Sequence, residues 1–478
     1  MKQIIKCNRK EILFLIFSFL LILVFSKSSP LYAFNDSGDI NTYMIIGKGI
    51  KNGYMPYRDL FDHKGPVFLF FFGLINLISE TSFVGVFVIE VIACYVSIHF
   101  VSEIFKIYNI NNVVYSLLSA LLIYTARAFG YGGQTVEEFS MPIILYLMYV
   151  GVRYAVKNIN ISNKQYIIIG VLGSIILWSK YTILSFFIGW YIAIFILFIK
   201  RKQYKDILNS ILYIGIGVIA SSLMVILLLL FFGILKDCFN VYFLENIFNY
   251  GDSTSYITKL IDTNVYMSGY NVLLCLLLII TFGIALKSKN KNDKYIWLIP
   301  CLSIFLFPKP EVSLIYAIFP SLIMFIYLLT SVANNKKYIK NIGLCIIAIC
   351  IAINVLNNNN LKDMNRPIND YPICELTKGI NTNSLITLGL ESGYYTLTDN
   401  LPKYKYFYTP LYSNTKQRNF ERADHTNTTP PKYCIFRMDE EIKTNELTYN
   451  NSKYVKIKEV KGMYNGSELN YYLYKFKW

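Results

Sequence analysis

The chain has 478 residues, of which 54% are hydrophobic and only 16% are charged, and its mean hydropathy is +0.41. Ordinary soluble proteins carry about 25% charged residues, so this composition excludes a soluble globular protein and indicates one that lies in a membrane. The formal net charge is +16, but most Lys and Arg residues stand in short clusters between apolar runs, as cytoplasmic anchors do. No aromatic-basic module accompanies them, so we expect a lipid bilayer and no nucleic acid among the partners.

The amino-terminal segment places a basic cluster before an apolar run from Ile12 to Phe25. A signal peptide begins in the same way, but no small-residue cleavage site stands out, and further apolar runs follow. We therefore expect an uncleaved first span over residues 12–32, with its amino end in the cytoplasm. The polar loop that comes next, residues 34–66, is then outside.

The loop over residues 34–66 carries ionisable side chains beside the expected hydrocarbon boundary. They are Asp36, Asp39, Arg58, Asp59, Asp62, His63 and Lys64. Such groups are costly near lipid unless they are paired, hydrated or functional. Between the acids, Tyr43, Ile46 and Ile50 fall on one helical face, which predicts a short helix on the membrane surface. The pattern favours a functional site, with a solvated connector as the alternative.

The next apolar run, Val67 to Ile78, has only about a dozen residues, whereas a helix that spans a bilayer needs about 20. If this run lies in the outer interface, the basic clusters that follow it all fall on the cytoplasmic side. Those clusters lie near residues 106, 153–164, 200–205, 287–294 and 336–340. The positive-inside rule therefore predicts a second interfacial helix over residues 67–78.

Apolar runs along residues 1–356 predict a transmembrane domain. The expected spans are 12–32, 82–104, 113–131, 140–156, 161–179, 181–199, 208–234, 269–286, 295–307, 314–332 and 341–356. This gives an all-α polytopic membrane protein of about 11 transmembrane helices plus interfacial helices. Small residues such as Gly170, Gly173, Gly215 and Gly217 suit close helix contacts in lipid.

Residues 357–478 are polar and rich in proline, and they contain three strand-like runs, at 384–390, 432–437 and 454–460. The last run leads through Asn465-Gly466 into a further run, which predicts a β-hairpin. We expect a small C-terminal extracytoplasmic α/β domain. The nine cysteines contain no CxxC pair, so the sequence does not indicate a metal site or a disulfide framework, although Cys374 and Cys434 could pair in this domain.

Four more charged residues stand near the expected outer ends of the spans. Glu137 and Glu138 precede the fourth span, where a helix N-terminus stabilises an acid by up to ~1 kcal/mol, so capping explains one of them. Helping to form an acceptor or phosphate site is the alternative. Arg127 and Lys180 lie in apolar surroundings, where they either snorkel to the interface or bind a lipid phosphate.

One motif resembles a known family. Asp39 is followed by Tyr43 and Gly47, and then by Pro56-Tyr-Arg-Asp-Leu-Phe-Asp-His-Lys-Gly-Pro66. This pattern is similar to the first external loop of bacterial GT-C glycosyltransferases, the superfamily of the protein O-mannosyltransferases and the lipid A aminoarabinose transferase. The resemblance extends more loosely over the transmembrane domain. It implies a GT-C-like fold and transfer of a sugar from a polyprenyl-phosphate donor to an extracytoplasmic acceptor.

The chemistry that the resemblance implies needs few groups. Because the donor already carries a good leaving group, transfer needs a base for the acceptor hydroxyl and positive charge for the departing phosphate. Asp39 stands at the family's acidic position and is our candidate general base in an inverting transfer, with Asp36 as the alternative. Candidate substrate-binding residues are Asp36, Tyr43, Arg58, Asp59, Asp62, His63, Lys64, Arg127, Glu137, Glu138 and Lys180. The sequence identifies no cofactor, and a requirement for a divalent cation is left open.

The chain departs from the family at one further motif. Many members have a His-Tyr-type motif where this chain has Ser313-Leu-Ile-Tyr316, so the donor contacts near Lys309 and Glu311 are not carried over.

Two other functions stay open. A flippase or transporter of polyprenyl-linked saccharides would line a path with charges inside its spans, whereas here Glu90 and His99 lie inside a span and the other charges concentrate at the outer face. A polysaccharide polymerase or ligase would use the same donor lipid. We expect a plasma-membrane hexosyl- or pentosyltransferase whose acceptor is a glycan, lipid or protein of the cell envelope.

Overall fold

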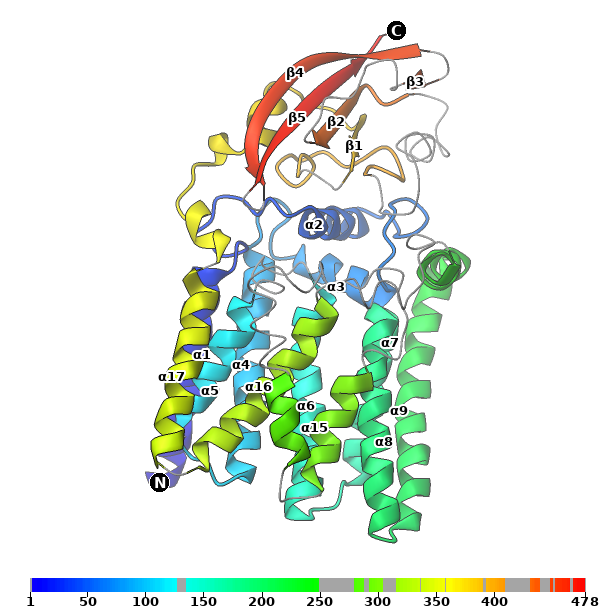
Figure 1. Cartoon of the computed structure of the whole chain (residues 1–478). Helices are drawn as coiled ribbons and strands as arrows, with labels where there is room; N and C mark the ends of the chain where they lie inside the picture. The colour runs from blue at the N-terminus through cyan, green and yellow to red at the C-terminus, as the bar shows by residue number, and fades with distance from the viewer. Residues whose placement is uncertain are drawn as a thin grey trace.

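The computed structural model describes residues 2–126, 135–248, 279–287, 292–303, 315–335, 337–356, 358–389, 393–408, 430–438, 448–449, 452–464 and 467–477. It has a bundle of long helices, with the amino terminus at one end and a β-sheet domain at the other (Figure 1). Two helices, α2 (Gly38–Lys51) and α3 (Pro66–Ile75), lie between the bundle and the sheet. This placement puts the loop of residues 34–66 where the two parts meet.

The helices of the bundle begin and end close to the predicted spans. They are α1 (Lys2–Phe25), α4 (Val84–Ile107), α5 (Val113–Thr125), α6 (Val136–Lys157), α7 (Asn163–Lys180), α8 (Leu184–Lys200), α9 (Tyr204–Phe231), α15 (Asp293–Ser303), α16 (Ile315–Ala333) and α17 (Lys337–Leu356). Residues 269–278 of one predicted span lie outside the described residues. The first span was predicted to start and end too late, because α1 begins at Lys2 and ends at Phe25, where a serine-rich turn follows.

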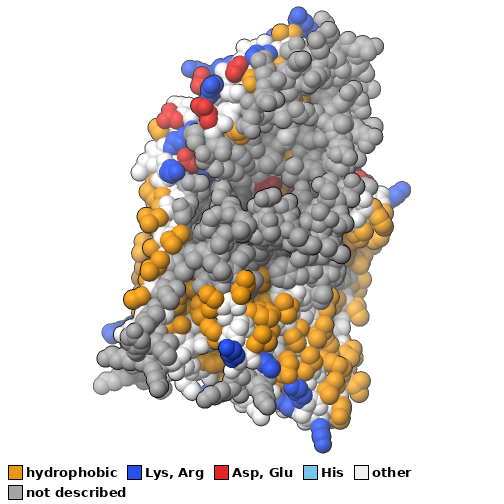
Figure 2. Space-filling model, viewed as in Figure 1, with side chains coloured by type: hydrophobic (Ala, Val, Ile, Leu, Met, Phe, Trp, Pro, Cys, Tyr) orange, Lys and Arg blue, Asp and Glu red, His pale blue; other side chains and the backbone are white. Residues whose placement is uncertain are grey.

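The surface of the bundle is apolar. On α9, side chains such as Leu208, Ile219 and Phe231 are exposed, and Figure 2 shows hydrophobic side chains over the helices with Lys and Arg near the lower end. Among the residues that the structure describes, four helical stretches are long and apolar enough to cross a membrane. They are 84–107, 136–157, 163–200 and 204–231, and the third contains both α7 and α8. The chain is therefore a membrane protein, and a total of eleven spans stays a prediction.

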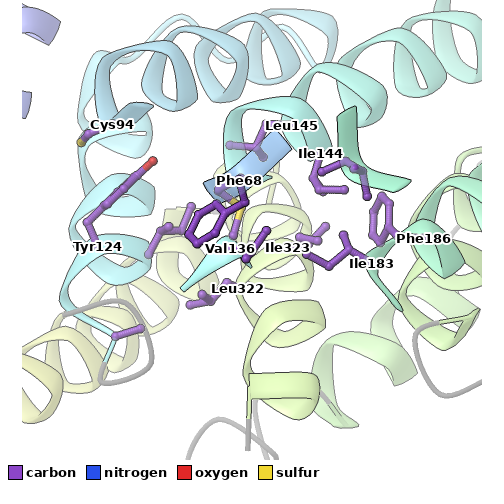
Figure 3. Packing of buried hydrophobic residues seen from close by; sticks show 14 of the residues in the cluster. Phe68, Cys94, Tyr124, Val136, Ile144, Leu145, Ile183, Phe186, Leu322 and Ile323 are labelled. Carbon is purple, nitrogen blue, oxygen red and sulfur yellow. The ribbon is translucent and has the colours of Figure 1, made fainter. Parts of the chain in front are cut away.

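The interior of the bundle is packed with apolar side chains from several helices. Figure 3 shows Phe68 of α3 near Val136 of α6 and Ile323 of α16. Helices α7 and α9 come together where Gly170 faces Gly217, and a Cβ on Gly170 would lie 2.2 Å from the Ile214 carbonyl oxygen. Gly170 and Gly217 therefore allow the backbones to approach, as predicted. The prediction was wrong for Gly215, where a Cβ would meet no atom within 4 Å, and a Cβ on Gly173 would make only an ordinary contact with the Phe187 ring.

Helix α3 is too short to span a bilayer. Its ten residues rise about 15 Å at 1.5 Å each, about half of a hydrocarbon core of ~30 Å. Pro66 occupies its first turn, where a missing N–H costs nothing. At Gly47 of α2, a Cβ would lie 2.4 Å from the Phe72 carbonyl oxygen. Only glycine therefore allows α2 to rest directly on α3.

The sheet domain contains the strands β1 (Leu385–Leu388), β2 (Tyr433–Met438), β3 (Thr448–Tyr449), β4 (Ser452–Tyr464) and β5 (Ser467–Phe476). Their order is β1-β2-β5-β4-β3, and β1 pairs with β2 in parallel while the other pairs are antiparallel. Tyr464 pairs with Ser467, so two residues connect β4 and β5 as the hairpin prediction requires. Those two, Asn465 and Gly466, lie outside the described residues. Cys374 and Cys434 are both free thiols, which contradicts a disulfide between them.

A buried lysine connects the segment that follows the first helix of the transmembrane domain to the segment that follows its last helix. Lys27 follows α1, and its Nζ lies 2.7 Å from Asp36 Oδ1 and 2.6 Å from Asp363 Oδ2. Its side chain is only 3% exposed. Asp363 belongs to the short helix η4 (Asn359–Asp363), which follows α17, and Asn360 of the same helix donates to the Phe25 carbonyl over 2.9 Å. The segment that leads into the sheet domain is thereby fixed to the start of the loop.

Replacing Lys27 with methionine is expected to lower the melting temperature of the purified protein in detergent. The change removes the ammonium from Asp36, whose side chain is 14% exposed, and leaves Asp363 with Arg366 alone, 3.3 Å away. Removing one partner of a buried ion pair costs roughly 3–5 kcal/mol. Lys51→Met is the matched control, because Lys51 pairs with Glu80 on the surface, with 38% and 28% of the side chains exposed. Such surface pairs contribute about 0–1 kcal/mol. Equal shifts in the two variants would contradict a structural role for Lys27.

The expected orientation can be tested with two single cysteines. Lys378 is exposed in the sheet domain, and Lys205 is exposed near the start of α9 at the other end of the bundle. The two variants are Lys378→Cys and Lys205→Cys. In intact cells an impermeant thiol reagent should label the first above the background of the unmodified chain and the second only after permeabilisation. The opposite result would place the loop of residues 34–66 in the cytoplasm.

Candidate active site

The turn after α2 is built by its own charged residues. The Asp59 carboxylate accepts a hydrogen bond from the Met55 N–H over 2.7 Å and pairs with Arg58 over 2.8 Å. Although partial burial raises it, the Arg58 guanidinium and the Met55 N–H bring the pKa of Asp59 below its ordinary value. Arg58 is largely exposed. Both residues therefore order the turn, and Asp59 already has its cationic partner.

The following residues, Asp62, His63 and Lys64, form a tighter structure. Asp62 is 2% exposed, and its Oδ1 accepts from the Lys64 N–H over 2.7 Å, which closes an Asx turn. Its Oδ2 accepts from the Tyr408 hydroxyl over 3.0 Å. Burial raises the pKa of Asp62, while the Lys64 charge and these hydrogen bonds oppose the rise. The Lys64 ammonium lies 2.9 Å from His63 Nε2 and 6.0 Å from the centre of the Tyr43 ring.

Gly65 brings this loop onto the tip of α7. Its N–H donates to the Ser179 carbonyl over 3.0 Å, and a Cβ would lie 2.1 Å from the Trp178 carbonyl oxygen. No other residue fits there. Asn246 adds a second contact by donating to the His63 carbonyl over 2.8 Å. Residues near the tip of α7 and those after α9 therefore meet the loop of residues 34–66, as the predicted spans require.

At the tip of α7, Lys180 forms an ion pair with Glu137 over 2.5 Å. Glu137 is buried in the first turn of α6, where Thr135 caps the helix by accepting from the Glu138 N–H over 3.3 Å. The sequence offers Lys180 no nearby carboxylate, but the fold supplies one from another helix. Lys180 therefore does not depend on a lipid phosphate for an anionic partner.

Three of the predicted acids gather around one buried tyrosine. Tyr43 packs on Phe68 and Phe72, with ring centres 5.0 Å and 5.3 Å apart. Burial raises the pKa of Tyr43 well above its ordinary value, and the charges of Asp39, Asp62 and Glu137 raise it further. Its hydroxyl is buried and has no hydrogen-bond partner among the described residues. Acids from α2, from the loop after α2 and from α6 thus all contribute negative charge at the buried Tyr43 side chain.

The structure distinguishes the two candidate bases. Asp39 lies in the first turn of α2 and is exposed, and no described residue donates a hydrogen bond to its carboxylate. Asp36 instead is bound to Lys27 in the buried ion group described above. A general base must reach a substrate proton, which an exposed carboxylate does and one held in a buried ion pair does not.

Some predicted residues lie outside the described part of the chain. They are Arg127, the residues 130–134 of the second acidic loop, Lys309, Glu311 and the first two residues of the 313–316 motif. Among the described residues, no group of three or more His, Cys, Asp or Glu side chains is placed to hold a metal ion.

Sequence reasoning missed the contacts from the sheet domain. Tyr408 bonds to Asp62, and the Lys48 ammonium donates to the carbonyls of Thr398 and Asn400 over 2.6 Å and 3.2 Å. Nothing in the local pattern around residue 408 indicates a partner in the first loop. These contacts make the sheet domain part of the site.

The fold defines a class of membrane protein, in which transverse helices and an end domain enclose a polar loop at the end of a helical bundle. Among solved structures, it is similar to the crystal structure of ArnT from Cupriavidus metallidurans bound to undecaprenyl phosphate, with a TM-score of 0.56 and 8% identity over 97% of both chains. The predicted GT-C resemblance is thereby confirmed at the level of the fold. At the level of sequence, no family model and no curated protein matches the chain.

Replacing Tyr43 with phenylalanine is expected to leave the melting temperature unchanged or to raise it slightly. Removing a buried hydroxyl that has no protein partner removes a desolvation cost rather than a bond. Tyr57→Phe is the matched control, since Tyr57 is equally buried and its hydroxyl donates to the Lys64 carbonyl over 2.7 Å. It should lower the melting temperature, because it leaves a buried acceptor unpaired. A similar loss in both variants would show that the Tyr43 hydroxyl has a structural partner.

Proposed function

We propose that this chain is a GT-C glycosyltransferase that moves a sugar from a polyprenyl-phosphate donor to an extracytoplasmic acceptor, with Asp39 as the general base. The observation that carries this proposal is the contrast among the acids of the loop. Asp36, Asp59 and Asp62 are each held by protein partners, whereas Asp39 is exposed at the start of α2. The similarity to ArnT, whose structure holds undecaprenyl phosphate, supports a lipid-linked donor.

The reaction is a single displacement at the sugar. The acceptor hydroxyl gives its proton to Asp39, and its oxygen attacks the anomeric carbon on the face opposite the phosphate. The bond between the anomeric carbon and the phosphate oxygen breaks, and the phosphate leaves with the electron pair. Configuration at the anomeric carbon is therefore inverted. Because the phosphate is a good leaving group, cations that stabilise its charge are enough, and no strong general acid is needed.

Lys64 is the best-placed cation for that phosphate. Within the described residues it forms no ion pair, and its ammonium contacts the His63 ring and faces Tyr43. Lys180 is less available, because Glu137 already pairs with it. In this assignment Glu137 and Lys180 form one side of the site, and Arg58 and Asp59 keep the loop in shape. Glu138 serves the start of α6, and Arg127 stays a candidate for the phosphate.

The position of the site fits a lipid-linked substrate. The loop lies between the apolar bundle and the sheet domain (Figure 1), so a prenyl chain dissolved in the bilayer would bring its phosphate to the level of α3. A hydrophilic acceptor would approach from the sheet side. A base at the start of α2 then faces the acceptor, and a cation in the loop faces the donor.

Asp39→Asn is expected to lower turnover by about 10²- to 10⁴-fold, the contribution of a typical general base. The melting temperature should not fall, because the Asp39 side chain is exposed. Asp36→Asn is the matched control three residues away. It weakens the ion group around Lys27, so it should lower the melting temperature and retain far more activity. The measurement is sugar transfer by purified protein in liposomes, with a panel of polyprenyl-phosphate sugars as donors.

An inactive Asp36→Asn together with an active Asp39→Asn would move the base to Asp36. If both variants transfer sugar normally, the loop is a connector and the proposed mechanism is wrong. Translocation of lipid-linked sugar across the liposome membrane without transfer would instead identify a flippase.

A further inference from the structure

One segment of the sheet domain, residues 403–408, lies against the loop of residues 34–66. On one side it extends the sheet, because the Thr387 N–H donates to the Phe407 carbonyl over 2.8 Å. On the other side the Phe61 N–H donates to the Lys405 carbonyl over 2.9 Å, and the Phe61 ring lies 4.9 Å from that of Tyr406. The segment thus joins the sheet to the residue directly before Asp62.

We propose that Tyr408 is a positioning residue of the donor site, which holds the Lys64 ammonium in place through Asp62. This inference rests on the proposed function, since it assigns Lys64 to the phosphate of a polyprenyl-phosphate donor. It adds a role for the sheet domain, which supplies a side chain that orders the phosphate-binding residue.

Each link in this chain of contacts is a hydrogen bond, and the one between Tyr408 and Asp62 is buried. The Tyr408 hydroxyl donates to Asp62 Oδ2 over 3.0 Å, and Asp62 Oδ1 accepts from the Lys64 N–H over 2.7 Å. Both oxygens of a carboxylate that is 2% exposed are therefore satisfied. On its other side, the Lys64 carbonyl accepts from the Tyr57 hydroxyl over 2.7 Å. The backbone of Lys64 is held at both its N–H and its carbonyl, so its side chain begins from a fixed point.

Loss of the Tyr408 hydroxyl would leave one oxygen of Asp62 buried without its donor. A buried carboxylate in that state turns toward another donor or toward water. Either movement disturbs the Asx turn, and with it the Lys64 backbone. Binding and catalysis are sensitive to displacements of about 1 Å at a positioned group. The expected consequence is weaker binding of the donor phosphate, with the sheet domain still attached to the bundle.

The attachment itself does not depend on Tyr408. Lys48 donates to two carbonyls of the sheet domain, and the ion group of Lys27 binds the segment that leads into it. A purely structural role for Tyr408 would therefore be a small part of a larger interface, whereas a positioning role makes its effect specific to Lys64.

The test measures binding of undecaprenyl phosphate to the purified full chain. Tyr408→Phe should weaken binding by about tenfold, the effect of one hydrogen bond to a charged group. Tyr454→Phe is the matched control, because the Tyr454 hydroxyl donates within the sheet domain, to the Pro431 carbonyl over 2.6 Å. It should bind as the wild type does.

A double-mutant cycle with Lys64→Gln shows whether the effect passes through Lys64. If it does, Tyr408→Phe weakens binding in the wild-type chain and adds nothing when Lys64 is already glutamine. Equal losses in both backgrounds, or no loss in the wild type, would overturn the inference. If Tyr408→Phe does not fold, Asp62→Ala takes its place in the cycle, since it removes both acceptor oxygens and so breaks the same connection from the other side.

The two proposals fail in different ways. A wild-type chain that binds no undecaprenyl phosphate would overturn the lipid-donor function and the inference with it. If the wild-type chain binds the lipid and Tyr408→Phe binds it equally well, the inference alone is overturned.

Discussion

The structure depends on one buried ammonium group. Lys27 stands between Asp36 and Asp363, which come from the start of the loop and from the segment after α17. A buried charge without a partner is strongly unfavourable, so the three segments are stable only when they are together. Helix α2 begins two residues after Asp36. The position of Asp39 is therefore set by a contact that serves the fold, while Asp39 itself stays available to a substrate.

Much of the architecture could be predicted from the sequence, because it depends on the spacing of apolar residues and on the lengths of the apolar runs. The apolar spacing of residues 43–50 predicts α2, and the shortness of the run after Pro66 predicts that α3 does not span. The strand-like runs of the sheet domain predict β1, β2, β4 and β5, whereas the short strand β3 was not predicted. The end of the first span was placed too late, because an apolar average over residues 12–32 hides the serine turn that follows α1.

The site was predictable in composition but not in its pairings. The loop at 34–66 could be recognised from its charges beside lipid, but the Lys180–Glu137 pair and the Tyr408–Asp62 hydrogen bond join segments that no local pattern relates. Such contacts arise only when helices and sheet are assembled. They also change the assignment of roles, since acids that look equivalent in sequence differ in their partners: Asp36, Asp59 and Asp62 support the loop, and Asp39 faces outward.

The contacts of Asp363 and Tyr408 also have a consequence for biosynthesis. A ribosome makes α1, the loop and the bundle before it makes either residue, so a nascent chain that has just completed α17 has Lys27 with only one of its two carboxylates and Asp62 without its tyrosine donor. The membrane helices are then inserted around an unfinished loop. The contacts of the loop are complete only when the sheet domain has folded, so a chain truncated after α17 leaves both Lys27 and Asp62 without one of their partners.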